Sequence, residues 1–180
     1  VLFRSREGNS SHIHCSFRGL NGEMVLADDK DKEHGLSDVG RHFLAGMQKH
    51  LRELSLMWAP TINSYKRYQP GSFAPTAIRW GRDNRTCALR LVGHGPSLRV
   101  ENRVPGGDVN PYLAVAGMIA AGLDGIKNKL QLEPAFVGNA YASDSEFVPH
   151  TMEMAQKLWS ESAFVKEAFG EEVQKHYTNM

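Results

Sequence analysis

Residues 12–18 alternate strictly between polar and apolar side chains. The polar positions are His12, His14 and Ser16, and the apolar positions are Ile13, Cys15 and Phe17. A period of two is typical of a half-buried strand, because successive side chains of a strand point to opposite faces. We therefore predict a strand with a polar front and an apolar back, followed by a tight turn at residues 19–22.

A helical period replaces the alternation after a charged loop at residues 28–33. The apolar residues at this spacing are Val39, Phe43, Met47, Leu51 and Leu54. The pattern predicts an amphipathic helix that begins at Ser37 or Asp38 and ends before Pro60. Residues 61–75 carry Pro70-Gly71 and Pro75, which indicates an ordered loop.

Three strand-like segments follow, at residues 76–80, 86–92 and 98–104. Asn110-Pro111 then predicts the start of a second helix reaching about Leu130, since asparagine caps helices and proline is tolerated at the first helical position. Residues 151–177 predict one or two further amphipathic helices. The mixture indicates an α+β fold rather than a regular βαβ alternation.

Composition and charge exclude several classes of protein. The 180 residues are 41% hydrophobic and carry a net charge of +1, so no bulk charge demands nucleic acid or an anionic membrane as partner. The longest apolar run, residues 112–123, is shorter than the roughly 20 residues that span a bilayer. Two cysteines are too few for a disulfide framework and suit a reducing compartment. A soluble, cytoplasmic protein is expected.

Both ends of the chain carry unusual signals. The first five residues, VLFRS, are the translation of GTG-CTC-TTC-CGA-TCT, a string found in common sequencing-library adapters. We expect residues 1–5 to be such an artefact. The helical pattern near Met180 continues without a capping glycine or proline. Residues 6–180 are therefore expected to be a fragment open at both ends.

The predicted first strand carries candidate metal ligands. His12 and His14 share a face and can point into one cleft, where neutral imidazole is a common metal ligand. The alternative is a pair of histidines on a solvated face. Cys15 points to the other face and is interpreted as core, which disfavours a zinc finger because four closely grouped ligands are needed.

Basic residues dominate the stretch from residue 66 to residue 103. They are Lys66, Arg67, Arg79, Arg82, Arg85, Arg90, Arg99 and Arg103. The same stretch contains only two acidic residues, Asp83 and Glu101. Arginine suits bidentate contacts to carboxylate or phosphate, so a small anionic ligand is one interpretation. A nucleic-acid surface with stacking aromatics and a plain solvated surface are the others.

Arg99, Glu101 and Arg103 fall on one face of the third predicted strand. A carboxylate between two arginines is held ionised. It could form a surface ion-pair ladder, or it could bind a metal beside arginines that hold substrate and phosphate. Oxygen and imidazole ligands suit Mg²⁺ or Mn²⁺.

Three segments carry a resemblance to a known family. They are GNSSHIHCSF (8–17), PTINSYKRYQPGSFAPTAIRWGRDNRTCALRL (60–91) and RVENRVPGGDVNPYLAVAGMIAAGLDGI (99–126). In this order and spacing, over residues 6–177, the chain resembles the later part of the glutamine synthetase catalytic domain. The resemblance implies a partial catalytic domain of this α+β type, with antiparallel strands forming an active-site sheet flanked by helices. It also implies that the small β-grasp domain and the first metal-binding segment are absent.

The resemblance further implies a role for each matching residue. The divalent ion, Mg²⁺ or Mn²⁺, would be held by His12 and Glu101. The nucleotide ATP would be contacted by His14, Ser16, Arg90 and Arg99. Glutamate would be contacted by Gly8, Arg67, Arg85 and Arg103. Of these, Arg85 and Arg103 would act catalytically on the transferred phosphoryl group and the γ-glutamyl phosphate formed from L-glutamate.

One position departs from the ammonia-using pattern. Members of the bacterial type carry a glutamate in the flap after the proline–glycine pair, whereas Phe73 stands there in this sequence. An aromatic ring cannot accept a proton, but it can line a pocket for a carbon-bearing amine. The resemblance therefore favours a branch that joins glutamate to polyamines or ethanolamine, with a glutamine synthetase using ammonia as the alternative.

The resemblance also implies partners. Family members assemble as stacked rings, so a homo-oligomer, a dodecamer in the full-length protein, is expected, with neither nucleic acid nor membrane as partner. The isolated fragment is expected to be inactive and poorly soluble. A catalytically inactive relative that serves as a binding or scaffold protein is a second alternative.

Overall fold

The computed structural model describes residues 9–72 and 74–179. The expectations for residues 1–5, Gly8 and Phe73 lie outside these residues. The strands are β1 (Ile13–Cys15), β2 (Ala77–Arg82), β3 (Cys87–Val92) and β4 (Arg99–Asn102). The longer helices are α1 (Asp38–His50), α4 (Pro111–Lys127), α5 (Met152–Glu161), α6 (Ala163–Phe169) and α7 (Glu171–Thr178). The short ones are α2 (Ser55–Trp58), α3 (Ile62–Tyr65), η1 (Gly95–Ser97) and η2 (Ala140–Ala142).

The four strands form one sheet in the order β1-β4-β3-β2. The β1–β4 and β4–β3 pairs are antiparallel, as the expected active-site sheet requires. The β2–β3 pair is parallel, so the sheet also contains one parallel pair besides the expected antiparallel strands. Residues 83–86 return along the sheet, so that Cys87 begins β3 opposite Ala77 at the start of β2. The outer edge of β2 is covered by residues 146–148, whose backbone bonds to Thr76 and Ile78.

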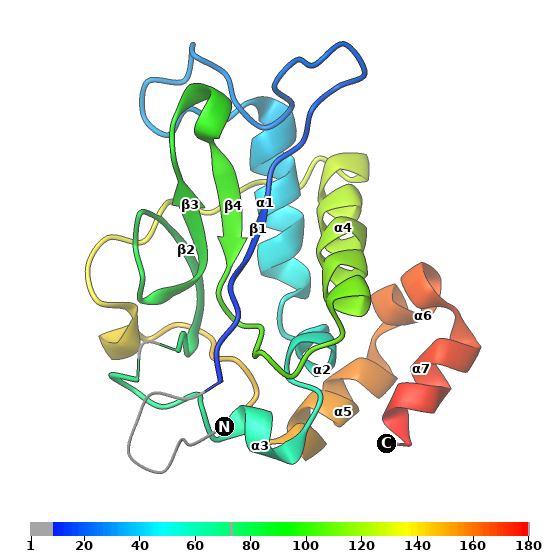
Figure 1. Ribbon diagram of the computed structural model, residues 1–180. Coiled ribbons are helices and arrows are strands. Elements are labelled where there is room, and N and C mark those ends of the chain that lie inside the picture. The colour runs from blue at the N-terminus through cyan, green and yellow to red at the C-terminus, as the bar shows by residue number, and fades with distance from the viewer. Residues whose placement is uncertain (1–8, 73, 180) are drawn as a thin grey trace.

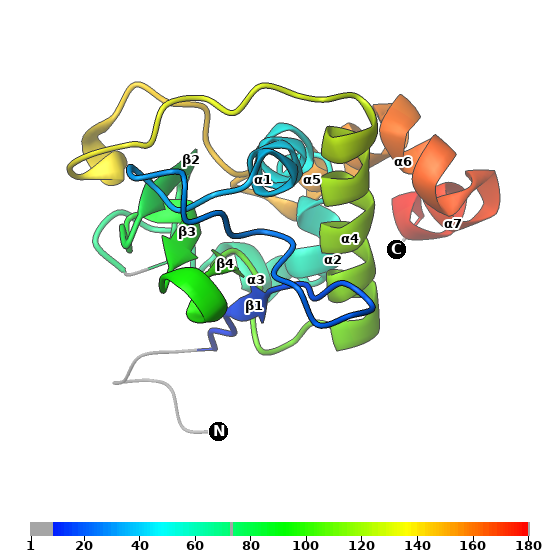
Figure 2. The ribbon, with the colours of Figure 1, turned by 90° about the horizontal axis from the view of Figure 1, so that it is seen from above.

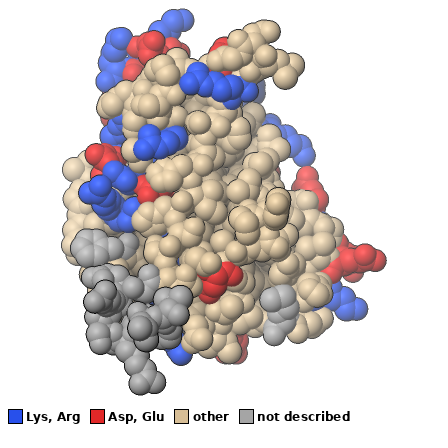
Figure 3. Space-filling view, viewed as in Figure 1, with Lys and Arg blue, Asp and Glu red and all other residues tan. Residues whose placement is uncertain are grey.

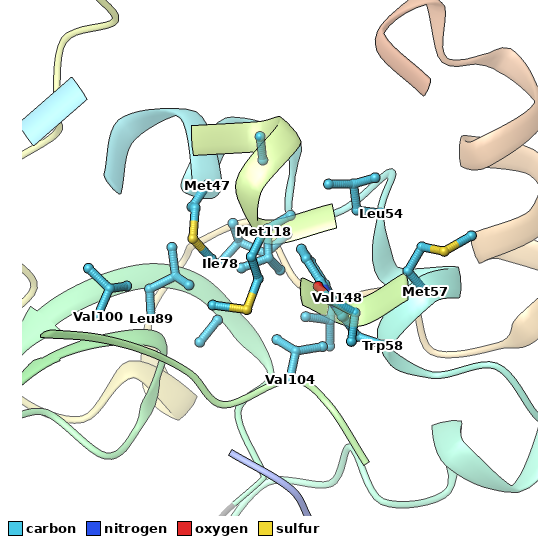
Figure 4. Packing of buried hydrophobic residues seen from close by; sticks show 14 of the residues in the cluster. Met47, Leu54, Met57, Trp58, Ile78, Leu89, Val100, Val104, Met118 and Val148 are labelled. Atoms are coloured by element: carbon cyan, nitrogen blue, oxygen red, sulfur yellow. The ribbon is translucent and has the colours of Figure 1, made fainter. Parts of the chain in front are cut away.

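Helices α1 and α4 pack together on one side of the sheet, and α5, α6 and α7 extend the helical side away from it (Figures 1 and 2). Figure 4 shows Met47 of α1 and Met118 of α4 beside Leu89 and Val100, which come from the apolar face of the sheet. All four side chains are buried in one hydrophobic cluster. The alternation of the strands therefore leaves the other face free for polar groups.

Glycine permits the close approach of α1 and α4. A Cβ added at Gly46 would lie 2.1 Å from the Ala121 carbonyl oxygen, and one at Gly125 would lie 2.0 Å from the His42 carbonyl oxygen. The two helix backbones therefore touch where their glycines face each other. The glycines of α4 therefore serve packing.

The predicted elements are present, but several bounds differ. The first strand is only three residues long, because β4 pairs with Ile13–Cys15 alone. Beyond it, Phe17 turns to pack edge-to-face on Phe43, with ring centroids 5.0 Å apart. The helix expected to reach Pro60 ends at His50 and resumes as α2 after a tight turn.

The loop and the last helical region also differ from the expectation. Within the expected loop 61–75, Thr61 caps the short helix α3. The C-terminal region forms three helices. Ser162 caps a new helix after α5, and Gly170, with φ of +86°, ends that helix before α7 begins. Among the described residues, no helix has both the length and the apolar character needed to cross a membrane.

Candidate active site

Glu101 lies at the centre of the polar face of the sheet. In the strand register, His14 of β1 is opposite Glu101 on one side and Arg90 of β3 is opposite it on the other. Residues directly opposite each other on antiparallel strands share a face. A histidine, a carboxylate and an arginine therefore form one row across three strands.

The Glu101 carboxylate is almost fully buried, with 2% of its side chain exposed. Its Oε1 lies 2.9 Å from His12 Nδ1 and accepts from Arg103 Nη1 at 3.0 Å. Its Oε2 accepts from Arg90 Nη1 at 3.0 Å. The His14 Nε2 is slightly farther, at 3.6 Å from Oε1. The sheet thus brings together four of the predicted site residues around one carboxylate.

Burial and charge act in opposite directions on the pKa of Glu101. Burial by itself raises the pKa, but the hydrogen bonds with His12 and Arg90 and the charge of Arg103 lower it to about 2. Glu101 is therefore an anion at any physiological pH. For His14, burial is the largest influence and lowers the pKa, assisted by Arg99 and opposed by Glu101. His14 is thereby biased toward the neutral imidazole.

The residues predicted to contact ATP lie in the outer part of the site. Arg99 Nε donates to His14 Nδ1 at 3.2 Å, and its Nη1 donates to the Ser97 carbonyl at 3.0 Å. Arg90 also donates to Asp83, with Nε 3.0 Å from Oδ1. Ser16 is exposed just beyond β1, at a position that continues the polar side of the strand.

Arg67 is held at the end of β4, apart from the Glu101 cluster. Its Nη2 donates to the Val104 carbonyl, which also accepts from Tyr68 Oη at 2.9 Å. Its guanidinium lies over the Tyr68 ring, 4.9 Å from the centroid. Nearby, Asp108 Oδ2 accepts from Ser64 Oγ at 2.6 Å and from Thr61 Oγ1 at 3.1 Å.

Arg85 lies in the loop between β2 and β3, where its side chain is exposed. It lines a surface pocket of about 460 Å³ together with Arg82, Asp83 and Asn84. Within the described part of the chain it makes no hydrogen bond or ion pair to Glu101. Its predicted catalytic role stays a prediction.

Two acidic residues had no role assigned from the sequence. Asp83 appeared only as a counter-charge to the basic stretch, yet it pairs with Arg90. Asp108 lay within one of the matching segments without an assigned role. Its contacts to Thr61 and Ser64 join parts of the chain that are 44 or more residues apart. In the sequence, the only signal was that both residues lie near arginines. Nearness along the chain does not show which side chains make contact in the fold.

His12 and Glu101 are suited to a shared divalent cation. Their closest atoms are 2.9 Å apart, Glu101 is ionised, and imidazole with carboxylate is a donor set that Mg²⁺ or Mn²⁺ accepts. Residues 9–72 and 74–179 do not bring three His, Cys, Asp or Glu side chains into one metal-binding group. Cys15 is unsuited as a ligand, since burial raises the pKa of its thiol to about 12. It packs against the hydrophobic core, as predicted.

A family model described as "Glutamine synthetase, catalytic domain" matches residues 2–180. The chain belongs to this family. The sheet and the basic side chains around Glu101 therefore lie within part of a glutamine synthetase catalytic domain.

Curated relatives include enzymes with different acceptors. The chain is 59% identical to gamma-glutamylethanolamide synthetase GlnA4 of Streptomyces coelicolor over 99% of its length and 38% of that protein. It is 41% identical to type-1 glutamine synthetase 2 of Dictyostelium discoideum, over 97% of the chain and 34% of that protein. It is also 41% identical to a glutamate–isopropylamine ligase of a Pseudomonas species, over 96% of the chain and 38% of that protein.

A solved structure of GmaS in complex with ADP superposes on the chain with a TM-score of 0.85 at 30% identity. The match covers 96% of this chain and 41% of GmaS. The chain thus spans well under half the length of the relatives it matches.

Proposed function

We propose that the complete protein is an ATP-dependent ligase that joins the γ-carboxylate of L-glutamate to an amine through a γ-glutamyl phosphate. The observation that carries the proposal is the buried, ionised Glu101, surrounded by His12, Arg90 and Arg103 in a chain of the glutamine synthetase family. A carboxylate is a poor electrophile toward an amine, so phosphorylation of glutamate must come first. ATP supplies the phosphoryl group, and phosphate leaves when the amine attacks.

His12 and Glu101 would hold one divalent cation, Mg²⁺ or Mn²⁺. When bound, such a cation would neutralise part of the negative charge on the nucleotide phosphates. Glu101 keeps a full negative charge for this purpose, because its neighbours hold its pKa at about 2. His12 would offer its imidazole from the same face of the sheet.

The arginines would position anionic groups around that pair. Arg90 and Arg103 already donate to Glu101 and are fixed by it, so their positive charges would lie next to the phosphates without reorganisation. Arg99 and His14 would contact the nucleotide next to Ser16. Arg67 would hold the α-carboxylate of glutamate beside Gly8, and Arg85 would reach the transferred phosphoryl group from its exposed loop.

The acceptor is proposed to be an organic amine, such as ethanolamine or a polyamine. Two features support it: the 59% identity to a gamma-glutamylethanolamide synthetase, and Phe73 in place of the flap glutamate. Ammonia is the alternative acceptor, since a type-1 glutamine synthetase is 41% identical. A catalytically inactive scaffold is disfavoured, because a scaffold has no need of a buried carboxylate amid arginines.

We propose that the complete protein acts in the cytoplasm as a homo-oligomer of stacked rings, with neither nucleic acid nor membrane as partner. Several arginines of the basic stretch are occupied inside the chain. Arg82 donates to backbone carbonyls and contacts His94, and Arg79 pairs with Glu133. Sedimentation of the complete protein tests the ring. Retention on heparin that falls steeply with salt would indicate a nucleic-acid surface instead.

The activity is tested by ADP release from the complete protein with ATP, Mg²⁺ and L-glutamate. Ammonium, ethanolamine, putrescine and spermidine are offered separately. We expect glutamate-dependent ADP release with a preference for one organic amine. Preference for ammonium would establish the alternative, and absence of release with every amine would refute the ligase.

A further inference from the structure

The asparagine that precedes Arg85 uses all of its side-chain hydrogen-bonding capacity. Asn84 Nδ2 donates to the carbonyl of Phe136 at 3.2 Å and to that of Gly138 at 2.9 Å. Its Oδ1 accepts from the backbone N of Thr86 at 3.0 Å and from Thr86 Oγ1 at 2.7 Å. An amide side chain has two donors and two acceptor lone pairs, so all of them are occupied. Asn84 therefore joins the loop between β2 and β3 to a part of the chain that lies 52 to 54 residues away.

That distant segment is itself bound to the sheet and to the loop. Phe136 N donates to the Trp80 carbonyl of β2 at 2.8 Å. Ala140 N, at the start of η2, donates to Thr86 Oγ1 at 2.9 Å. Gly81 permits the close packing, since a Cβ added there would lie 2.8 Å from the Phe136 carbonyl oxygen. The loop is thus held against a segment that β2 holds in turn.

The residue at the start of the loop is also fixed. Asp83 has φ of +50°, which makes a tight turn directly after β2. Its backbone N donates to the Leu91 carbonyl at 2.9 Å, and its carboxylate pairs with Arg90. The residues before and after Arg85 are therefore held by hydrogen bonds to several parts of the fold.

Arg85 itself differs from these neighbours. Its side chain is exposed and, among residues 9–72 and 74–179, takes part in no hydrogen bond or ion pair. It lines the surface pocket of about 460 Å³. An unpaired guanidinium can bind an incoming anion without first giving up a partner, and a fixed backbone limits where it can reach. The loop thus presents one unpaired arginine from a rigid base.

We infer that Asn84 is a positioning residue, which places Arg85 for contact with the phosphoryl group transferred to glutamate. The inference rests on the proposed function, in which Arg85 reaches that group from its loop. Developing charge is stabilised best by donors that are already in place, and a misplacement of about 1 Å can lower the rate about 100-fold. Loss of the Asn84 amide would release the loop from residues 136–138 and let Arg85 shift.

The test is a double-mutant cycle in the complete protein, with Asn84→Ala and Arg85→Ala made singly and together. Product is followed with labelled L-glutamate, ATP, Mg²⁺ and the amine that the wild type uses fastest. N84A should lower kcat about 10- to 100-fold when Arg85 is present, with the KM for ATP unchanged. In R85A the same substitution should lower kcat by less than about twofold, because no guanidinium is left to position.

Two further variants separate positioning from folding. Thr86→Val removes the hydroxyl that bonds Asn84 and the Ala140 amide while keeping the shape of the side chain. It should also lower kcat only when Arg85 is present, which keeps the test decisive if N84A does not fold. Asn128→Ala, at the end of α4, removes an asparagine bonded to Asp124 and is the control, with kcat unchanged. Melting temperatures show that the rates compare folded proteins.

The outcomes are distinct. An unchanged kcat in N84A, or the same fold-loss with and without Arg85, overturns the positioning role while leaving the ligase intact. R85A with the wild-type kcat overturns it as well, because Arg85 then makes no contribution for Asn84 to support. Arg85→Lys, which keeps the charge, replaces R85A in the cycle if R85A falls below detection. A wild-type protein without glutamate-dependent ADP release overturns both proposals.

Discussion

Arg90 of β3 lies directly opposite Glu101 of β4, and its Nη1 donates to Glu101 Oε2 at 3.0 Å. The other side of the same guanidinium donates to Asp83, so the arginine bridges a buried and an exposed carboxylate. Because Glu101 is also bonded to Arg103, one carboxylate fixes an arginine of β3 and the arginine that directly follows β4. The geometry of the site therefore depends on this single charge.

Glu101→Gln should remove both activity and stability. The neutral amide removes the charge that faces the buried guanidinium of Arg103 and leaves Arg90 with Asp83 as its acidic partner, and losing one partner of a buried pair costs about 3–5 kcal/mol. The free energy of unfolding from urea denaturation measures the loss, and ADP release should fall at least about 100-fold. The matched control is Glu133→Gln, whose partner Arg79 is at the surface and whose loss should change stability by under about 1 kcal/mol. Equal stability of the two variants would contradict the central role of Glu101.

Gly125→Ala should destabilise the crossing of α1 and α4. The new Cβ would lie 2.0 Å from the His42 carbonyl oxygen, so the helices must separate, at a cost of about 1–3 kcal/mol. Gly117→Ala in the same helix is the control, because its nearest atoms are 3.7 Å away and alanine favours helix. Thermal unfolding of both variants checks the prediction. A G125A protein as stable as G117A would show that the helices do not touch there.

Asp31 should make stability depend on pH in the acid range. Burial raises the pKa of its carboxyl, but bonds from the Leu36, Glu33 and His34 amides outweigh this and lower it, with help from Arg41. A lowered folded-state pKa means that the stabilisation is complete above the unfolded value, about 3.9, and is lost as pH falls through the folded value.

The measurement is urea denaturation of wild type and Asp31→Asn between pH 6 and pH 2.5. The wild type should be more stable at pH 6, and the difference should shrink as the pH falls below about 4. The exposed Asp29 provides the control, since D29N should follow wild type throughout. A difference independent of pH would show that the Asp31 charge is not the cause.

Phe73→Glu should shift the acceptor preference of the complete protein toward ammonium. A carboxylate can pair with ammonium and accept its proton, whereas a phenylalanine ring accepts no proton. The ratio of kcat/KM for ammonium to that for the preferred organic amine should rise about tenfold or more, measured by ADP release. Phe73→Leu is the control, because it removes the ring without adding a base. If F73E leaves the ratio unchanged, acceptor choice is set elsewhere.

Residues 1–180 produced alone should show no glutamate-dependent ADP release and should self-associate. The described residues bring no three His, Cys, Asp or Glu side chains into one metal-binding group, and α4 exposes an apolar stripe that includes Tyr112, Ile119 and Leu123. Figure 3 shows a broad uncharged area across the centre of the face viewed in Figure 1. Light scattering and the ADP assay check both parts. Turnover above background, or a monodisperse monomer, would contradict the expectation.

The sequence by itself determined the local elements and the chemistry on offer. The alternation at residues 12–18 placed His12 and His14 on one face and Cys15 on the other. Asn110-Pro111 marked the start of α4, because the capping side chain and the fixed proline angle act within one turn. The three matching segments indicated the family and thus the roles of Glu101 and its arginines.

Tertiary structure decided which of these residues meet. Because β4 pairs with both β1 and β3, Glu101 contacts His12, which lies 89 positions before it, and Arg90, which lies 11 positions before it. The tertiary structure also sets β2 parallel to β3, brings Asp108 to Thr61 and Ser64, and leaves Arg85 exposed. Spacing along the chain does not contain these relations. They follow from how strands pair and how the hydrophobic core closes, which bring together side chains with no periodic relation in sequence.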